Sequence, residues 1–308
     1  MALPDHLTQL ATRVSNTGRW GPDDQRGTLN LIDAPAVLRG VAAARQGRVF
    51  LLSIPFDEDG PQTGAIPGRE NPVRRMLSVN AAYTGDPTDF CTSDDALTMG
   101  VQAATHWDAL AHVSYEGRMY NGVDAAVVDE TGAAKLGIDA TGPIVARGLL
   151  ADVARVHGVD HFDDGHAVTG DDLDAAMELG GLTPAPGDVL LVRTGQMHFL
   201  RAGDRNRYAN PSPGLSTQSV EWLHDHDIAA VATDTLVFEV WPGEDPAALL
   251  PVHLLHLVDM GLLQGQLWAL DDLAADCAAD GQYDFLLSAT PLPLTRSTGG
   301  PVAPTAVK

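Results

Sequence analysis

The sequence predicts a mixed α/β fold built as one domain over residues 1–308. Helix-like and strand-like patterns alternate along the chain, and the sequence contains no internal repeat or low-complexity block. No segment is both long and polar enough to act as an interdomain linker. With 44% hydrophobic and 19% charged residues, the chain can bury a large core. We therefore expect a mixed β-sheet covered by helices.

The first elements follow from local signals between residues 33 and 71. Asp33 can cap a helix that carries Pro35 in its first turn and ends near Gly47. A strand is expected over 48–54. Six proline and glycine residues then fall within 55–71, which predicts a long loop. Loops of this length in compact domains are often functional.

Later elements are expected to alternate in the same way. Strands are predicted at 97–105, 146–154, 188–193, 228–240 and 283–289. Helices are predicted after the capping box Thr169–Asp172, after Ser216, and over 249–260 with an end at Gly261. Residues 1–47 would form an N-terminal extension. The proline- and glycine-rich residues from about 291 to 308 are expected to form an irregular tail on the surface.

The charge balance excludes two classes of partner. The chain has 19 Lys and Arg against 41 Asp and Glu, a net charge of −22. Such a surface repels phosphate backbones and anionic membranes, so no nucleic-acid or membrane partner is expected. The most apolar stretch, 249–258, is interrupted by Pro251 and two histidines and is too short to span a bilayer. We expect a soluble protein, by default cytoplasmic because the first residues do not resemble a secretory signal.

One segment combines the residue types that chemistry needs. In Gln102-Ala-Ala-Thr-His106-Trp-Asp108-Ala-Leu-Ala-His112, the four side chains able to bind a metal or exchange protons, at 102, 106, 108 and 112, occupy even positions, so in an extended chain they share one face. Four such side chains are costly to bury unless they coordinate an ion or satisfy one another. A functional site and an internally hydrogen-bonded polar stripe are both compatible with this pattern. Common nucleotide-binding and serine-hydrolase motifs are absent.

Three other histidine clusters are interpreted as structural. Residues 157–166 are rich in His and Asp but lie in a glycine-punctuated polar stretch, which is typical of a solvated loop. His224 and His226 fall at an expected helix end, where polar or cationic side chains suit the dipole. His253 and His256 are neighbours on an apolar helix and are expected to be hydrogen-bonded core residues unless another cluster approaches them.

The segment QAATHWDALAH resembles the hallmark HxGTHxDxPxH of the cyclase family, which includes bacterial kynurenine formamidase and isatin hydrolase. Further segments match in order, among them RWGPDDQRGTLNLI, GRMYNG, PGDVLLVRTG, DTLVFEVWP and STGGPVAP. The resemblance covers most of the chain from about Trp20 onward and is closest to a longer, poorly characterised branch. It implies a swivelling β/β/α fold and assembly as a homodimer or homotetramer.

The resemblance also implies a metal site with one or two zinc or manganese ions. Its ligands would fall on Gln102, His106 and Asp108, with a later pair at His253 and Gln266, while His112 takes the place of the catalytic histidine. Gln102 and Gln266 stand where the family has His and Glu. A neutral amide oxygen is a weak ligand for a transition metal, so we expect one ion instead of two.

The leading hypothesis is metal-assisted hydrolysis of a cyclic amide, an N-formyl amide or a lactone. His106, Asp108 and His253 would hold one divalent ion with open positions, and His112 would act as general acid and base. The expected partner is a small-molecule substrate, whose identity would depend on loop 55–71. Apolar walls for a flat substrate are expected from Trp20, Trp107 and Tyr120.

Two alternatives remain open at this stage. In the first, the same pocket lacks a metal, and His112 and Asp108 transfer protons for the cyclisation, dehydration or isomerisation of a secondary metabolite. In the second, catalysis has been lost and the protein binds a small molecule. Retention of His106, Asp108, His112 and His253 favours an enzyme, since unused buried polar groups cost stability.

Overall fold

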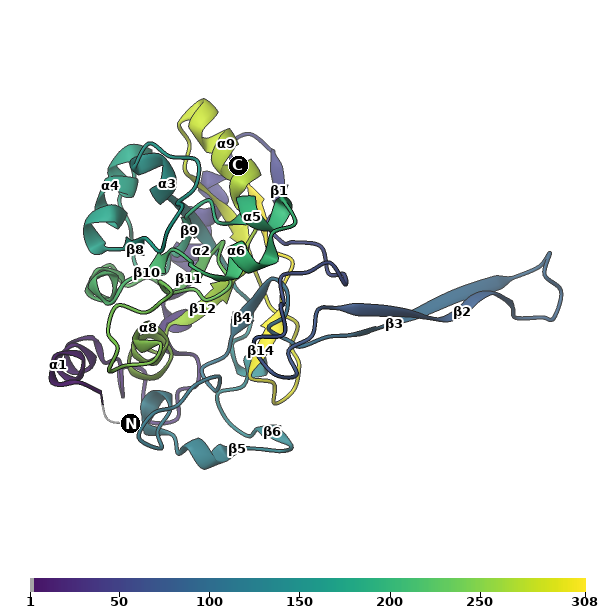
Figure 1. Ribbon diagram of the computed structural model, residues 1–308, viewed down its shortest axis with the longest axis horizontal. Helices are drawn as coiled ribbons and strands as arrows, with labels where there is room; N and C mark the ends of the chain where they lie inside the picture. The colour runs from purple at the N-terminus through teal and green to yellow at the C-terminus, as the bar shows by residue number, and fades with distance from the viewer. Residues whose placement is uncertain (1–2) are drawn as a thin grey trace.

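The computed structural model describes residues 3–308, and a mixed sheet of nine strands forms its centre (Figure 1). The strand order is β1-β15-β13-β7-β9-β11-β12-β4-β14, and β7, β9, β11 and β12 run parallel to one another. The remaining strands are antiparallel to their neighbours. The expected mixed α/β fold is confirmed.

The strands of this sheet are short, and smaller two-stranded sheets surround it. The sheet contains β1 (Val49–Leu51), β4 (His106–Asp108), β7 (Val145–Asp152), β9 (Val189–Arg193), β11 (Ala230–Thr233), β12 (Leu263–Gln266), β13 (Asp284–Ser288), β14 (Gly299–Pro301) and β15 (Thr305–Val307). The small sheets pair β2 (Val73–Ala82) with β3 (Cys91–Thr98), β5 (Val128–Asp129) with β6 (Gly132–Ala133), and β8 (Ala167–Val168) with β10 (Gly214–Leu215).

Helices cover the sheet. They are α1 (Asp5–Val14), α2 (Ala34–Ala43), α3 (Val153–Val156), α4 (Gly170–Gly180), α5 (Met197–Arg201), α6 (Arg205–Ala209), α7 (Val220–Asp225), α8 (Pro251–Leu254) and α9 (Asp271–Asp280), with a π-helical segment η6 (Leu255–Met260) directly after α8. Shorter 3₁₀ turns, among them η1 (Gly27–Leu31) and η5 (Thr217–Ser219), lie between them.

Side-chain alternation along the parallel strands divides the interior into two cores. In β9, Val189 and Leu191 pack into one cluster with α9, whereas Leu190 and Val192 pack into the other with α1, α4 and α7. This period of two is what a strand buried on both faces requires. The continuous apolar run of β9 therefore reflects its central place in the sheet.

The helix signals of the sequence are confirmed where caps define them. Asp33 accepts a hydrogen bond from the Ala36 amide at the start of α2. Thr169 and Asp172 form the expected capping box of α4. The predicted helix over 249–260 is present as α8 and η6, and it ends at Gly261 in the left-handed region.

Several strand expectations were wrong. Strand β3 ends at Thr98, and residues 99–105 form turns, so the predicted strand over 97–105 is displaced. Only 230–233 of the predicted strand 228–240 is extended in the sheet. The segment 291–308 is no irregular tail, because β14 and β15 complete both halves of the sheet. Strands of three residues flanked by Pro and Gly carry too few alternating positions to be seen in a sequence.

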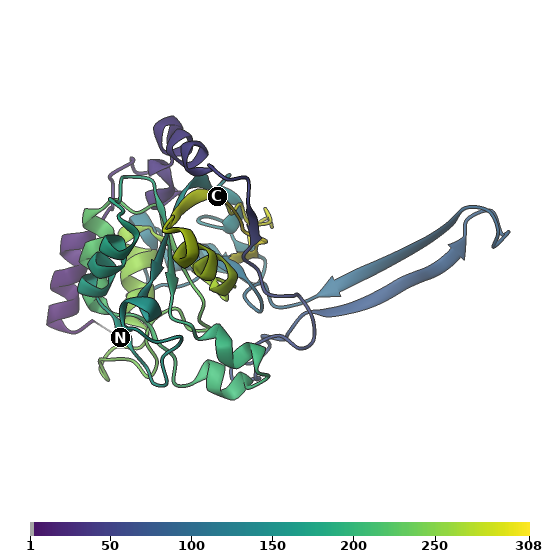
Figure 2. The same ribbon diagram turned by 90° about the horizontal axis from the view of Figure 1, so that it is seen from above.

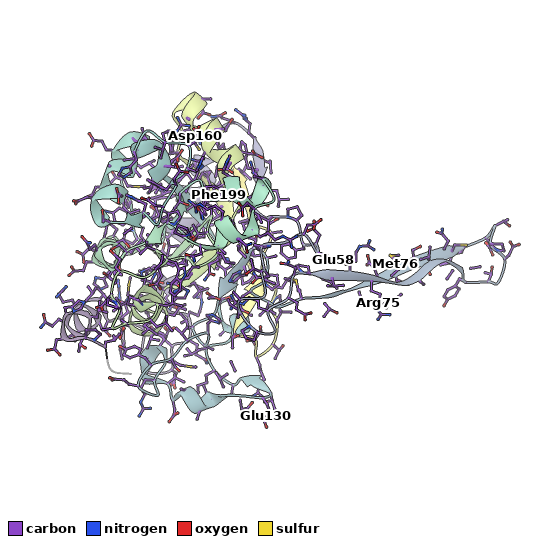
Figure 3. All side chains as sticks on the ribbon, viewed as in Figure 1. Glu58, Arg75, Met76, Glu130, Asp160 and Phe199 are labelled. Atoms are coloured by element: carbon purple, nitrogen blue, oxygen red, sulfur yellow. The ribbon has the colours of Figure 1, made fainter. Side chains whose placement is uncertain are left out.

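A long two-stranded hairpin projects from the body of the molecule. Figures 1 and 2 show β2 and β3 extending into solvent, away from the sheet and its helices. Figure 3 shows Arg75 and Met76 on this ribbon. Several large apolar side chains of the hairpin are exposed, among them Leu77, Val79 and Tyr83. Among residues 3–308, no helix is long and apolar enough to cross a membrane.

Candidate active site

The short strand β4 places two of the candidate residues together. His106 and Asp108 are alternate residues of this strand, so both point to one face, and Gln266 of β12 lies opposite His106 in register. Trp107 points to the other face, where its ring meets Trp268 edge to face at 4.9 Å. The alternation expected from the sequence therefore holds for His106 and Asp108, whereas Gln102 and His112 reach the site from turns on either side of β4.

A pair of buried acceptor atoms forms the centre of the site. The ring Nδ1 of His106 donates to the Ala104 carbonyl at 2.7 Å, which leaves a lone pair on Nε2 of the neutral ring. This Nε2 lies 3.5 Å from Oδ1 of Asp108. Within residues 3–308, neither atom has a hydrogen-bond partner, although both are buried. Two facing acceptors without a donor need a cation or a proton between them.

Asp108 is ionised in this setting. Burial raises the pKa of its carboxyl, but the charges that His112, His106 and His253 carry when protonated, together with the contact with His106, outweigh burial and hold the pKa well below its usual range. Its second oxygen, Oδ2, accepts a hydrogen bond from the Gln266 amide at 2.8 Å. One carboxylate oxygen is therefore satisfied by the protein, and the other faces His106 without a donor.

His253 approaches Asp108 from α8. The sequence left a functional role open for this histidine only if another cluster came close to it, and the Asp108 cluster does. Its Nδ1 donates to Glu239 at 2.5 Å, and the amides of Val252 and His253 donate to the same carboxylate at 3.1 and 3.0 Å. This leaves the His253 Nε2 lone pair directed at the site, 3.4 Å from the Gln266 amide nitrogen. Glu239 is thus a positioning residue that sequence reasoning missed.

The two glutamines act as hydrogen-bond donors in the structure. Gln266 presents its amide nitrogen to Asp108 and His253, and Gln102 presents its amide nitrogen to Nδ1 of His112 at 3.4 Å. The atoms that fit a metal ion first are His106 Nε2 and Asp108 Oδ1, because both are buried and without a hydrogen-bond partner.

The site opens into a cavity of about 840 Å³ whose floor includes His112, His253 and Gln266. The side chain of His112 is 22% exposed, in contrast to the fully buried Asp108. Burial lowers the pKa of His112, and His253, His106 and Arg69 lower it further against the opposing effect of Asp108. The imidazole is therefore neutral near pH 7, as a group that exchanges protons must be before it accepts one.

The aromatic walls expected from the sequence lie elsewhere. Trp107 and Tyr120 are fully buried in the core, and the Tyr120 hydroxyl donates to Asp24. Trp20 lies under the Arg19 guanidinium, away from the residues that line the cavity. The apolar walls are instead Ala65, Ile66, Val113, Leu236, Val237, Trp241 and Leu250. Strand alternation turns Trp107 away from the site, because it separates His106 from Asp108.

A second group of potential ligands lies outside this cavity. The ligand atoms of His157, His166 and Asp172 all lie within 4.8 Å of one another, and this group could hold a metal ion. Asp172 caps α4 and pairs with His157 at 2.6 Å and with His166 at 3.3 Å. Its oxygens are thus satisfied by the protein, unlike those of Asp108. The sequence singled out the two histidines but missed Asp172, which completes the group.

The remaining histidines have structural partners. His226 Nδ1 donates to the Trp222 carbonyl at 2.8 Å, and His224 lies 3.1 Å from Asp225. Burial lowers the pKa of His256 to about 3, and its Nδ1 contacts Gln264 at 3.0 Å. These contacts agree with the structural interpretation of His224, His226 and His256.

Comparison with known proteins shows the family of the chain. The family model named Cyclase matches residues 50–240. The chain belongs to the cyclase family. A crystal structure described as that of a novel cyclase is 35% identical, has a TM-score of 0.88, and aligns over 97% of this chain and 99% of its own. A search of curated proteins found no match.

Two isatin hydrolase structures share the fold of this cyclase-family chain at lower identity. One, bound to the product analogue thioisatinate, is 20% identical with a TM-score of 0.61, over 89% of this chain and 98% of its own. The other, isatin hydrolase A from Labrenzia aggregata bound to benzyl benzoate, is 20% identical with a TM-score of 0.64, over 87% and 98%.

Proposed function

We propose that the chain is a metal-assisted hydrolase that opens a cyclic amide, an N-formyl amide or a lactone. The observation that carries this proposal is the pair of unpartnered acceptors, His106 Nε2 and Asp108 Oδ1, 3.5 Å apart beneath a large cavity. Family membership supports an enzyme, and the two isatin hydrolases that share the fold act on a cyclic amide. A zinc or manganese ion suits a ligand set of imidazole and carboxylate.

His106 and Asp108 would hold the ion, with His253 Nε2 as the next lone pair directed at the site. When bound, a divalent ion would polarise the scissile carbonyl and lower the pKa of its bound water. Glu239 keeps the proton of His253 on Nδ1 and so keeps Nε2 unprotonated. The Gln266 amide anchors Oδ2 of Asp108, which leaves Oδ1 as the oxygen available to the ion.

His112 is placed to move the proton that hydrolysis requires. Its ring lines the cavity, with Nε2 3.7 Å from Asp108 Oδ1 and Nδ1 3.4 Å from the Gln102 amide nitrogen. As water adds to the carbonyl carbon, the neutral ring of His112 takes the proton that the water loses and becomes an imidazolium. It then gives this proton to the leaving nitrogen or oxygen as the bond to the carbonyl carbon breaks, which returns the ring to its neutral form.

One observation favours a second candidate, in which the same residues work without a metal. The amide nitrogens of Gln102 and Gln266 face the site, and within residues 3–308 only the His157 group brings three His, Cys, Asp or Glu ligand atoms within 4.8 Å of one another. Asp108 and His112 alone could then transfer protons for cyclisation, dehydration or isomerisation. Turnover that survives exhaustive chelation would identify this version.

Two variants test the leading proposal together. His106→Ala removes a ligand and should abolish both metal binding and turnover. His112→Ala removes the proton-transfer group and should abolish turnover while the metal content stays at the wild-type level. A panel of cyclic amides, formamides and lactones supplies the assay. Full turnover in the His106→Ala variant would refute metal-assisted hydrolysis, and full turnover in the His112→Ala variant would refute the proton-transfer role.

A further inference from the structure

Arg69 lines the same cavity as His112, His253 and Gln266. It lies near the end of the long loop 55–71, and its side chain is half-buried. The aliphatic stem of Arg69 passes directly over Gly100, where an added Cβ would lie 3.3 Å from the Arg69 Cγ. The absence of a side chain at Gly100 therefore lets the stem settle against the backbone and leaves the guanidinium at the cavity wall.

The guanidinium of Arg69 has no partner of its own. Across the described chain from 3 to 308, it makes neither a hydrogen bond nor an ion pair; burial lowers its pKa, and only the more distant charge of Asp108 opposes this. Other half-buried arginines are paired: Arg147 donates to Asp188 at 2.6 Å, and Arg193 donates to Asp152 at 2.8 Å. A partly desolvated guanidinium with five free donors is costly unless a ligand completes it.

The other charges at the cavity are already engaged. Arg207 donates to the Pro211 carbonyl at 2.8 Å and stacks over Phe199 at 4.1 Å. Asp204, the acidic residue of the lining, caps α6 through the Arg207 amide at 3.0 Å. In a chain of net charge −22, Arg69 thus gives this cavity a free positive charge that attracts anions.

We propose that Arg69 binds a carboxylate of the substrate, so that the enzyme acts on small molecules that carry a carboxylate besides the bond that is cleaved. The inference rests on the proposed function, because it takes this cavity as the active site. A planar guanidinium matches a carboxylate through two parallel hydrogen bonds. The apolar walls, which include Leu236 and Trp241, favour a flat hydrophobic body attached to that carboxylate.

The test compares ligands that differ only in the anionic group. Binding of 1-naphthoate, 1-naphthamide and 1-naphthyl phosphate is measured by isothermal titration calorimetry on the full-length protein as purified. The same titrations are made on Arg69→Gln and on the matched control Arg75→Gln, which lies on the exposed hairpin (Figure 3). Metal content and melting temperature are recorded for each protein. Because Arg69 lacks partners in the protein, the Arg69→Gln variant should melt at the wild-type temperature.

We expect wild type to bind naphthoate about tenfold or more tightly than naphthamide, and Arg69→Gln to lose that preference, since a hydrogen bond to a charged group is worth this factor. Arg75→Gln should behave as wild type. Equal binding of naphthoate and naphthamide by wild type, or an unchanged preference in Arg69→Gln, would overturn the proposal. Tighter binding of the phosphate would overturn the assignment to a carboxylate. Because turnover is not the readout, a failed hydrolase proposal would leave these results interpretable.

Discussion

Glu239 offers a sensitive test of how the site is held together. It is 2% exposed and accepts hydrogen bonds from the Val252 amide, the His253 amide and the His253 ring. In the Glu239→Gln variant, one of these three donors would face an amide NH₂ group, and the other two would meet a neutral oxygen. Losing one hydrogen bond costs about 1–3 kcal/mol and weakening two costs about 1 kcal/mol each. Removing the buried charge offsets about 1 kcal/mol of this, so the free energy of unfolding should fall by about 2–4 kcal/mol.

The assay is urea unfolding followed by circular dichroism, with Glu130→Gln on the exposed β5–β6 turn as the matched control (Figure 3). The control should change the free energy of unfolding by less than about 0.5 kcal/mol. Because Glu239 also fixes the protonated nitrogen of His253, the Glu239→Gln variant should bind a divalent metal more weakly. An unfolding free energy equal to that of the control would refute the account of Glu239 as the residue that anchors His253.

The remaining predictions concern pH and assembly. Burial and Asp271 raise the pKa of Asp234 to about 6 against the opposing hydrogen bonds from Thr194, so the unfolded chain loses this proton first and stability falls as pH rises from about 4 through 6. Between pH 5 and pH 8 the fall, measured by urea unfolding, should be about 1.4 kcal/mol larger in wild type than in Asp234→Asn; identical pH profiles would contradict it. We also propose that a second copy of the chain covers the β2–β3 hairpin, because an isolated two-stranded ribbon is marginal in water. Glutamate at both Leu77 and Val79 should then lower the mass measured by light scattering, whereas Leu38→Glu on the exposed face of α2 should not; an unchanged mass in the hairpin variant would contradict the proposal.

Much of the framework of the fold was predictable because its signals are local. Asp33, Thr169 and Gly261 predict helix ends because they are capping residues, and the continuous apolar run of β9 predicts a buried strand. The C-terminal strands β14 and β15 were missed because each has three residues and gains its definition only from neighbours distant in sequence. Pairing of this kind is a tertiary property that no local pattern records.

The site was predictable only where its residues share a short segment. His106 and Asp108 lie on one strand, so their common face followed from spacing. Glu239 and Arg69 carry no motif of their own, and the capping box identified Asp172 only as a residue at a helix start. The importance of Glu239, Asp172 and Arg69 at a site comes from the groups that the fold brings to them: His253, two histidines and an open cavity, respectively. The prediction that Trp107 lines the substrate pocket was wrong, because an aromatic residue between two site residues on a strand must point to the opposite face.

The most direct test of the central claim is the metal content of the purified protein, measured by elemental mass spectrometry on wild type, His106→Ala and His112→Ala. The account predicts about one equivalent of zinc or manganese in wild type and in His112→Ala, and its loss in His106→Ala. Metal retained at the wild-type level in His106→Ala, or no metal in wild type after incubation with excess zinc and manganese, would contradict it.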